Sequence, residues 1–250
     1  MIDFTPNPRP APRLAQIWAH ARMEAGLILS NGEQLLLSVV IPLSVLLGGR
    51  FLGERFAMPF SELAPSVLAM VLWSSGLTTL AISTGFERRY NVLERLAATP
   101  LGREGVLLGK SLSILLITVA QLLVLTGLAV VLGWRPDIQP LPTLLAVASG
   151  AIGLASFIAL GLAIAGSLRP ETTLAVANLL FLCGLALGIV IPVAALPDWA
   201  WFVQFLPTAA VGEALRAVSS GAVVWLPLVV VSLWALAAAA LARKVFKWTS

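Results

Sequence analysis

The chain has 250 residues, of which 59% are hydrophobic and only 11% charged, and its formal net charge is +4. A soluble domain carries roughly 25% charged residues, because water must solvate its surface. The composition therefore excludes a soluble globular protein and predicts that lipid covers most of the outer surface. The basic excess is then typical of loops held on one side of a bilayer, and it does not indicate a nucleic-acid partner.

The first predicted element is an amphipathic helix over residues 13–31. Its apolar residues recur at helical spacing. The polar positions lie largely on the other side: Arg13, His20, Arg22 and Glu24. We expect the helix to lie on the membrane surface, with Arg13, Trp18 and Arg22 at the interface. The alternative is a cytosolic extension that packs on the helical bundle.

Six apolar segments are long enough to cross a bilayer, which takes roughly 20 residues of α-helix. They lie at 34–52, 64–85, 106–132, 144–168, 172–193 and 223–242. Pro42 in the first segment predicts a kink, because neighbouring groups in a membrane protein can satisfy the carbonyl that proline frees. The sequence thus predicts an all-α membrane protein with six transmembrane helices in one domain over 1–250.

The basic residues predict the orientation of these spans. Most of them fall in the segments before the first span, between the second and third, between the fourth and fifth, and after the last. The alternate loops hold only Arg50, Arg55, Arg135 and Arg216. The positive-inside rule places the first set in the cytoplasm. We therefore expect a multi-pass protein of the plasma or inner membrane with both termini cytoplasmic.

Residues 194–221 separate the fifth and sixth spans on the outer side. The segment is rich in tryptophan and phenylalanine but is broken by Pro197 and Pro207. Such a segment can enter the outer leaflet as a re-entrant helical hairpin when protein covers its backbone. The alternative is a plain external loop that contains an interfacial helix.

The predicted spans offer little catalytic chemistry. His20 is the only histidine and lies outside them, and they hold no paired carboxylates. Gly105 to Ser111 resembles a phosphate-binding loop, but its glycines are separated by three residues where that loop needs four. We expect no metal site, no bound cofactor and no enzymatic activity in this chain. Gln121 and Asn178 are the polar residues within the spans that could line a translocation path.

The loop between the second and third spans carries the densest charge, and residues 86–100 predict a short amphipathic helix. Thr99 and Pro100 end it, because the residue before a proline is disfavoured in a helix. The polar face comprises Glu87, Arg88, Asn91, Glu94 and Arg95. We interpret this face as a docking surface. The alternative is a solvated loop whose charges only set the topology.

The chain resembles the permease subunits of type-2 ABC exporters, especially the drug-export branch. The resemblance rests on Glu87-Arg88-Arg89, Leu93-Glu94-Arg95-Leu96, Ala98-Thr99-Pro100-Leu101 and Leu107-Leu108-Gly109-Lys110, with weaker support from Leu196-Pro197, Phe205-Leu206-Pro207 and Glu213-Ala214-Leu215-Arg216. Tyr90-Asn91 departs from the pattern, since the family commonly has a glycine after the charged pair.

The resemblance implies a function and a set of partners. It implies that the permease pairs with a second permease, the same chain or another, and that each docks an ATP-binding subunit, present as two copies or two chains. ATP and Mg²⁺ would bind in that subunit alone. The residues implied to couple the permease to it are Glu87, Arg88, Arg89, Asn91, Glu94, Arg95, Thr99 and Pro100. The helix over 13–31 resembles the interfacial connector of the family.

The apolar spans favour a hydrophobic or amphipathic substrate, such as a drug, lipid or glycolipid, moved out of the cytoplasm or inner leaflet. Two other classes remain open. A membrane-embedded lipid-modifying enzyme needs clustered acidic or histidine residues at a membrane face, and the sequence has no convincing cluster of this kind. A membrane assembly factor without cargo is separated from a transporter by copurification with an ATPase.

Overall fold

The structure is a computed structural model that describes residues 10–30, 32, 39–52 and 58–248. These residues form helices and connecting turns without a β-strand, which confirms the predicted all-α class. The elements run in chain order as α1 (Arg13–Ser30), α3 (Ile41–Leu52), α4 (Phe60–Trp73), η3 (Ser74–Thr79), α5 (Leu80–Arg89), α6 (Val92–Ala97), α7 (Gly102–Val131), α8 (Pro140–Ser167), α9 (Pro170–Gly184), η4 (Leu185–Ile189), η5 (Val193–Ala195), η6 (Asp198–Phe205), α10 (Pro207–Ser220) and α11 (Leu226–Val245).

Five helical stretches are long and apolar enough to cross a membrane. They are Phe60–Arg89, Gly102–Val131, Pro140–Ser167, Pro170–Ile189 and Leu226–Val245. These stretches coincide with the predicted second to sixth spans. The predicted first span, 34–52, lies partly outside the described residues, and its described part forms the short apolar helix α3. The six-span topology therefore stays a prediction.

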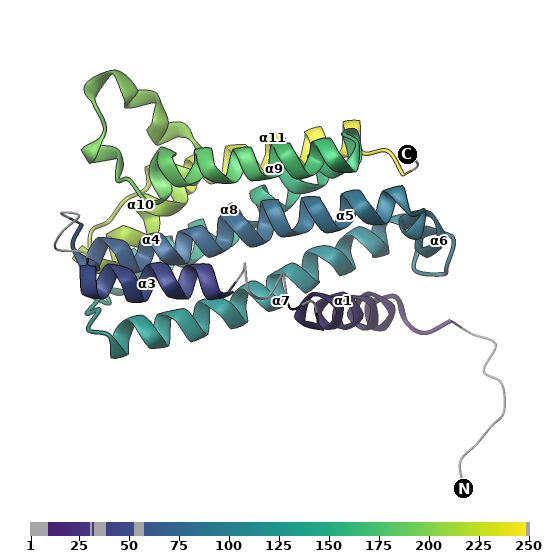
Figure 1. Cartoon of the computed structure of the whole chain (residues 1–250), viewed down its shortest axis with the longest axis horizontal. Coiled ribbons are helices and arrows are strands. Elements are labelled where there is room, and N and C mark those ends of the chain that lie inside the picture. The colour runs from purple at the N-terminus through teal and green to yellow at the C-terminus, as the bar shows by residue number, and fades with distance from the viewer. Residues whose placement is uncertain (1–9, 31, 33–38, 53–57, 249–250) are drawn as a thin grey trace, which may run out of the picture.

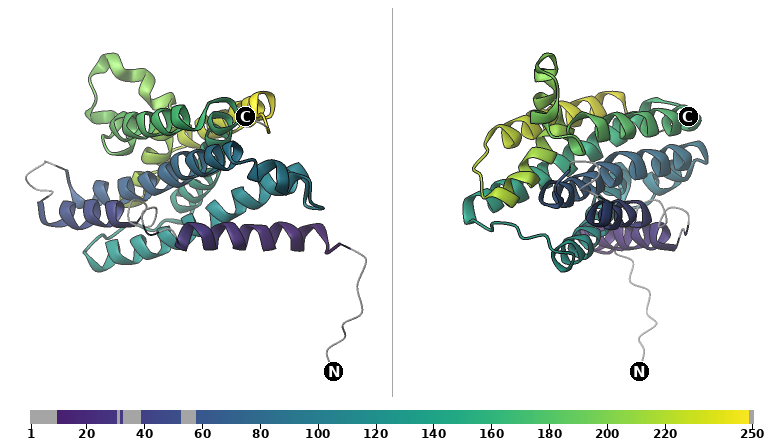
Figure 2. Two further views of the ribbon diagram at one scale, coloured as in Figure 1. Left: turned by 45° about the vertical axis from the view of Figure 1, so that its right-hand side comes forward. Right: turned by 60° about the vertical axis from the view of Figure 1, so that its left-hand side comes forward.

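The long helices lie side by side along the long axis of the molecule (Figure 1). α8 packs most closely against α11, and α1 runs along the outside of the bundle beside α7 (Figures 1 and 2). α4 lies at the centre, and nearly all of its side chains are buried. Trp73 from α4 meets Phe157 from α8 edge-to-face, with ring centroids 4.7 Å apart. Such a pair fixes the two helices against one another beyond simple burial.

The helix from Phe60 to Arg89 is interrupted by the π-helical turn η3. α8 crosses this turn very closely, because a Cβ at Gly161 would lie only 2.9 Å from the carbonyl oxygen of Gly76. Turns of this kind are often found at functional positions in helices. Here the turn brings polar side chains, including Ser74 and Thr78, into an otherwise apolar bundle.

The segment predicted as an outer hairpin, 194–221, is largely helical. η5 and η6 form a lobe that projects from the bundle, and α10 returns to pack among α4, α8 and α11 (Figure 1). Gly221 ends α10 in the left-handed conformation, with φ of 64°. The aromatic side chains of the lobe are exposed: Trp199, Trp201, Phe202 and Phe205. The entry of residues 194–221 into the outer leaflet as a re-entrant hairpin stays a prediction.

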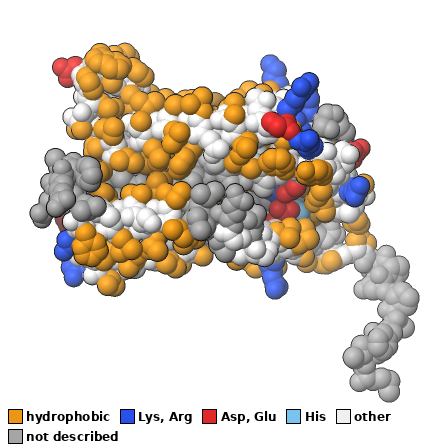
Figure 3. All heavy atoms as spheres, in the orientation of Figure 1, with side chains coloured by type: hydrophobic (Ala, Val, Ile, Leu, Met, Phe, Trp, Pro, Cys, Tyr) orange, Lys and Arg blue, Asp and Glu red, His pale blue; other side chains and the backbone are white. Residues whose placement is uncertain are grey.

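The charged side chains gather where the bundle carries α6 and the C-terminus (Figure 3). We call this the basic end. It holds Arg88, Arg89, Arg95, Arg103, Lys110, Arg169, Arg243, Lys244 and Lys247. Between the two ends, the side chains that Figure 3 colours by type on the visible face are mainly hydrophobic. This distribution matches the charge pattern on which the predicted orientation rests.

Candidate functional site

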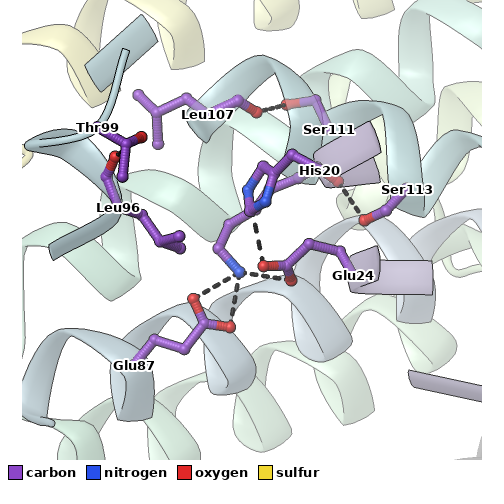
Figure 4. A network of polar contacts seen from close by, with 9 residues as sticks. His20, Glu24, Glu87, Leu96, Thr99, Leu107, Ser111 and Ser113 are labelled. Atoms are coloured by element: carbon purple, nitrogen blue, oxygen red, sulfur yellow. Dashed lines mark hydrogen bonds and ion pairs between the residues drawn. The ribbon is translucent and has the colours of Figure 1, made fainter. Parts of the chain in front are cut away.

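A buried lysine joins three helices at the basic end. The Lys110 side chain in α7 is only 1% exposed. Its ammonium group lies 2.8 Å from Oε2 of Glu24 in α1 and 2.6 Å from the carboxylate of Glu87 in α5. Figure 4 shows Glu24 and Glu87 pointing toward one another from different helices. One charged group thus connects α1 to the helix that leads into α6.

His20 completes this group of residues, which we call the Lys110 cluster (His20, Glu24, Glu87 and Lys110). Its Nε2 lies 3.6 Å from Oε1 of Glu24, one helical turn further along α1. The imidazole packs directly on Gly109, where a Cβ would overlap its ring. A glycine at this position is therefore what lets α1 approach α7 closely enough for the ion pair.

The pKa of His20 is lowered from its ordinary value near 6.5, chiefly because the ring is buried. The negative charge of Glu24 opposes this shift, and the positive charge of Lys110 adds to it. His20 is therefore neutral at physiological pH, and the Lys110 ammonium contacts both carboxylates of the cluster. Burying charges is tolerated only when they are paired in good geometry, and here the Lys110 ammonium lies within ion-pair distance of both Glu24 and Glu87.

Arg88 and Arg89 connect the same segment to the turn between α8 and α9. Arg88 is 5% exposed, and its Nη2 donates to the carbonyl of Leu168 at 2.5 Å. Arg89 forms an ion pair with Glu171 in the first turn of α9. Together with Glu87 and its partner Lys110, these residues clamp the end of α5 to three other parts of the bundle.

The prediction of a single amphipathic helix over 86–100 is wrong, because two helices share this segment. Glu87 to Arg89 end α5, and α6 begins only at Val92. Asn91 between them takes the left-handed conformation, with φ of 56°, which breaks the helix and turns the chain. Asparagine adopts this conformation more readily than most residues. It stands at the departure from the family pattern, after the charged pair.

The break divides the predicted polar face in two. Glu87 and Arg88 turn into the bundle, whereas Asn91, Glu94, Arg95, Thr99 and Pro100 are exposed, as is Arg89. Leu93 is fully buried and anchors α6 to the bundle. We call the exposed set, Arg89, Asn91, Glu94, Arg95, Thr99 and Pro100, the α6 face. It presents charges of both signs on a short helix with a fixed base.

The helix predicted over 13–31 is present as α1, but the expected division of its faces is partly wrong. His20 and Glu24 were expected on the polar face, and both are buried against α7. The reason is the Lys110 ammonium, which supplies a counter-charge within the bundle. Arg13, Trp18 and Arg22 are exposed, and Arg13 pairs with Glu104 in the first turn of α7 at 2.6 Å.

The two residues predicted to line a translocation path lie on different sides of η3. Gln121 in α7 is buried, and its Oε1 accepts a hydrogen bond from Ser75 at 3.1 Å. Asn178 lines a pocket of about 150 Å³ between α3, η3 and α9. The other lining residues are Ile41, Pro42, Met70, Ser74, Thr78, Thr79 and Phe181. Only Asn178 of the predicted pair therefore faces this pocket.

In the described part of the chain, no group of three or more His, Cys, Asp or Glu side chains is placed to hold a metal ion.

The comparison with protein families finds a match: the model of ABC-2 family transporter proteins matches residues 50–243. The chain belongs to the ABC-2 transporter family. A comparison with curated proteins finds no match. This match confirms the resemblance to type-2 ABC permeases. The assignment to the drug-export branch stays a prediction.

Membership assigns the general role of this ABC-2 permease, a membrane subunit that works with an ATP-binding partner. The matched region includes Glu87, Lys110 and the whole α6 face, and it begins after α1. The connection of α1 to the bundle through Glu24 and His20 is therefore a feature of this chain that the family match does not cover.

The sequence predicts the charged segment of this ABC-2 permease but not the buried position of Lys110 beside it. Helical spacing contained the signal, because Val106, Ile114 and Ile117 lie on the buried face of α7 at multiples of about one turn from Lys110. A lysine on such a face predicts a buried acidic partner. The identity of that partner could not be predicted, since Glu24 is 86 residues away in sequence.

Proposed function

We propose that this ABC-2 permease is the transmembrane subunit of an ATP-driven exporter. In this proposal it moves a hydrophobic or amphipathic substrate, such as a drug, lipid or glycolipid, out of the cytoplasm or inner leaflet. ATP and Mg²⁺ bind in a separate ATP-binding subunit, and a second permease, the same chain or another, completes the path. The basic end faces the cytoplasm, as the positive-inside rule expects.

The observation that carries the proposal is the α6 face on its fixed base. Exposed charges of both signs on a helix of only 6 residues would be mobile without support. Leu93 anchors this helix from below, and the clamp at Glu87, Arg88 and Arg89 holds the segment that leads into it. A rigid, charged protrusion of this kind suits the transfer of force from a partner protein.

The Lys110 cluster provides a route for that force. A push on α6 moves the end of α5, and Lys110 ties this end to α7 and α1. Because the ammonium group pairs with both carboxylates at once, the three helices move together. The π-helical turn η3, in the same long helix as α5, is then the point where this movement reaches the pocket beside Asn178.

The lining of the pocket beside Asn178 suits an apolar chemical group, and its volume of about 150 Å³ holds a part of a drug or lipid and not the whole molecule. Its walls are mainly apolar, with a few hydroxyl groups and one amide and no charged side chain. Sites for apolar ligands are typically lined in this way, with a small number of polar groups that fix orientation. A small inorganic ion would find no counter-charge there.

Charge reversal on the α6 face tests the proposal. We expect Glu94→Arg to reduce copurification of the ATP-binding subunit at least tenfold, because unlike charges across the interface would become like charges. Asp198→Arg is the matched control, since it reverses an exposed acidic residue in the outer lobe. Normal copurification and normal transport by Glu94→Arg and by Arg95→Glu would contradict the proposal.

A further inference from the structure

Arg216 in α10 is a buried cation at the end of the bundle opposite the basic end (Figure 1). It is 7% exposed and contacts α4, the end of α9 and Glu213 of its own helix. Nη1 donates to the hydroxyl of Ser66 in α4 at 2.9 Å and to the carbonyl of Ile189 at 2.7 Å. Nη2 donates to the carbonyl of Gly188 at 2.7 Å and to Glu213 at 2.8 Å.

The two carbonyls belong to the broken end of the α9 helix. Leu187 and Gly188 leave the helical conformation, with φ of −102° and 96°. Helix ends leave carbonyl groups without intrahelical partners, and these groups must be satisfied elsewhere when they are buried. Here α10 supplies the partners, because Thr208 also donates to the carbonyl of Leu187 at 2.9 Å.

The backbones of the two segments touch at glycines. A Cβ at Gly188 would overlap Ala209 of α10, and a Cβ at Gly212 would overlap the carbonyl of Gly188. Gly188 also requires the positive φ that glycine adopts at little cost. The broken end of α9 is therefore seated against α10 by shape as well as by hydrogen bonds.

Glu213 extends the arrangement toward the lobe. Its Oε1 accepts both the Arg216 hydrogen bond and one from the backbone amide of Val193 at 3.0 Å. One guanidinium group and one carboxylate thus join α4, the end of α9, α10 and the start of η5. Ionisable residues within the apolar part of a membrane protein are costly, and they generally mark a functional element.

A structural role alone does not require this arrangement. An unbroken α9 would satisfy its own carbonyls, and an apolar side chain at Arg216 would pack among α4 and α10 without the cost of burying a charge. A helix that is broken and then held by reversible polar contacts has two possible positions, held and released. We propose that Arg216 is a latch that holds the end of α9 closed against α4 and α10, and that its release opens the outer end of the path during transport. The role in transport rests on the proposed function.

A cysteine reporter tests the latch in the full-length chain in lipid nanodiscs, where a water-soluble maleimide reaches both faces. The reporter is Ile189→Cys in a Cys183→Ser background, because Ile189 is fully buried and its carbonyl accepts from Arg216. We expect Arg216→Met to raise the labelling rate of the reporter about tenfold or more, since losing a hydrogen bond to a charged group changes an opening equilibrium by about that factor. Arg216→Lys should have an intermediate effect, because an ammonium cannot reproduce the fork of the guanidinium.

Two controls separate opening from unfolding. Arg50→Met removes another arginine that donates to a helix-end carbonyl, that of Leu132, and should leave the reporter unchanged. A second reporter, Ile114→Cys, lies in the core of α7 and should stay protected in every variant. An unchanged rate at position 189 in Arg216→Met, with position 114 protected, would overturn the latch. If Arg216→Met exposes both positions, the labelling rates are measured in the milder variants Arg216→Lys and Glu213→Gln. An unchanged rate at position 189 in these variants, with position 114 protected, would overturn the latch.

A further arm separates the latch from the proposed function. In the complex with the ATP-binding subunit, a non-hydrolysable ATP analogue should raise labelling at position 189 in the otherwise native chain. It should add little in Arg216→Met, where the end of α9 is already released. Failure of this arm alone would contradict ATP-driven opening and leave the latch intact, whereas failure of the nanodisc experiment would overturn the latch itself.

Discussion

At the residue scale, the loss of Lys110 has a large energetic consequence. Removing one member of a buried ion pair leaves a charge without a partner and costs about 3–5 kcal/mol. We expect Lys110→Met to lower the stability by about this amount and to release α1, measured as protease cleavage within Arg13–Ser30. The triple variant Lys110→Met, Glu24→Gln and Glu87→Gln should recover part of the loss, because it buries no unpaired charge. Equal stability of the single and triple variants would contradict a paired cluster.

Gly109 offers a second test with a matched control on the same helix. A Cβ at Gly109 would overlap the His20 ring, whereas a Cβ at Gly127 would meet nothing within 4 Å. Gly109→Ala should therefore detach α1, while Gly127→Ala should be neutral or stabilise α7 by up to about 1 kcal/mol. Hydrogen exchange of the α1 amides reports the difference. Full protection of α1 in Gly109→Ala would show that the close contact is not required.

The pH dependence of α1 follows from His20. Because burial lowers the pKa of His20, folding favours the neutral imidazole. Its contribution to stability is present above the ordinary value near 6.5 and is lost as the pH falls below it. The charged groups that act on the ring are Glu24 and Lys110. We expect α1 to become more sensitive to protease between roughly pH 7.5 and 5.5, above the ordinary range of the carboxylates. His20→Gln should flatten this dependence, and a variant with the same pH profile as the native chain would contradict it.

At the element scale, Asn91 decides how α6 is presented. Its left-handed conformation turns the chain between α5 and α6. Asn91→Gly should therefore keep the turn and full binding of the ATP-binding subunit. Asn91→Val should cost roughly 1–2 kcal/mol in this conformation and favour a continuous helix that misplaces Glu94. Copurification of the ATP-binding subunit distinguishes the two variants, and indistinguishable binding would mean that the turn does not matter.

The elements that the sequence predicted well are those that a single helix determines by itself. Apolar length places the second to sixth spans, because the bilayer requires about 20 apolar residues whatever their neighbours are. The helix over 13–31 was likewise found from its periodicity. The faces of this helix were harder to predict, because the burial of His20 and Glu24 depends on Lys110, which lies far away in the sequence. Arg216 shows the same limit, since its partners on α4 and the end of α9 come together only in the folded chain.

At the scale of the whole molecule, the two ends of the bundle carry different clusters of polar side chains. The basic end carries the α6 face and the Lys110 cluster, and the opposite end carries Arg216 at the break in α9 (Figure 1). The helix Phe60–Arg89 runs between them and contacts both, through Glu87 and Ser66. In the proposed function, movement of this one helix would connect the partner at one end with the opening at the other.

The central claim is that an ATP-binding subunit sits on the α6 face, and site-directed cross-linking tests it most directly. In a Cys183→Ser background, a photoreactive maleimide is attached at Arg95→Cys or, at the opposite end, at Asp198→Cys in native membranes. We predict a cross-link to a Walker-motif ATPase from position 95 and none from position 198. A cross-link from position 198, or none from position 95 in a complex that still hydrolyses ATP, would contradict the account.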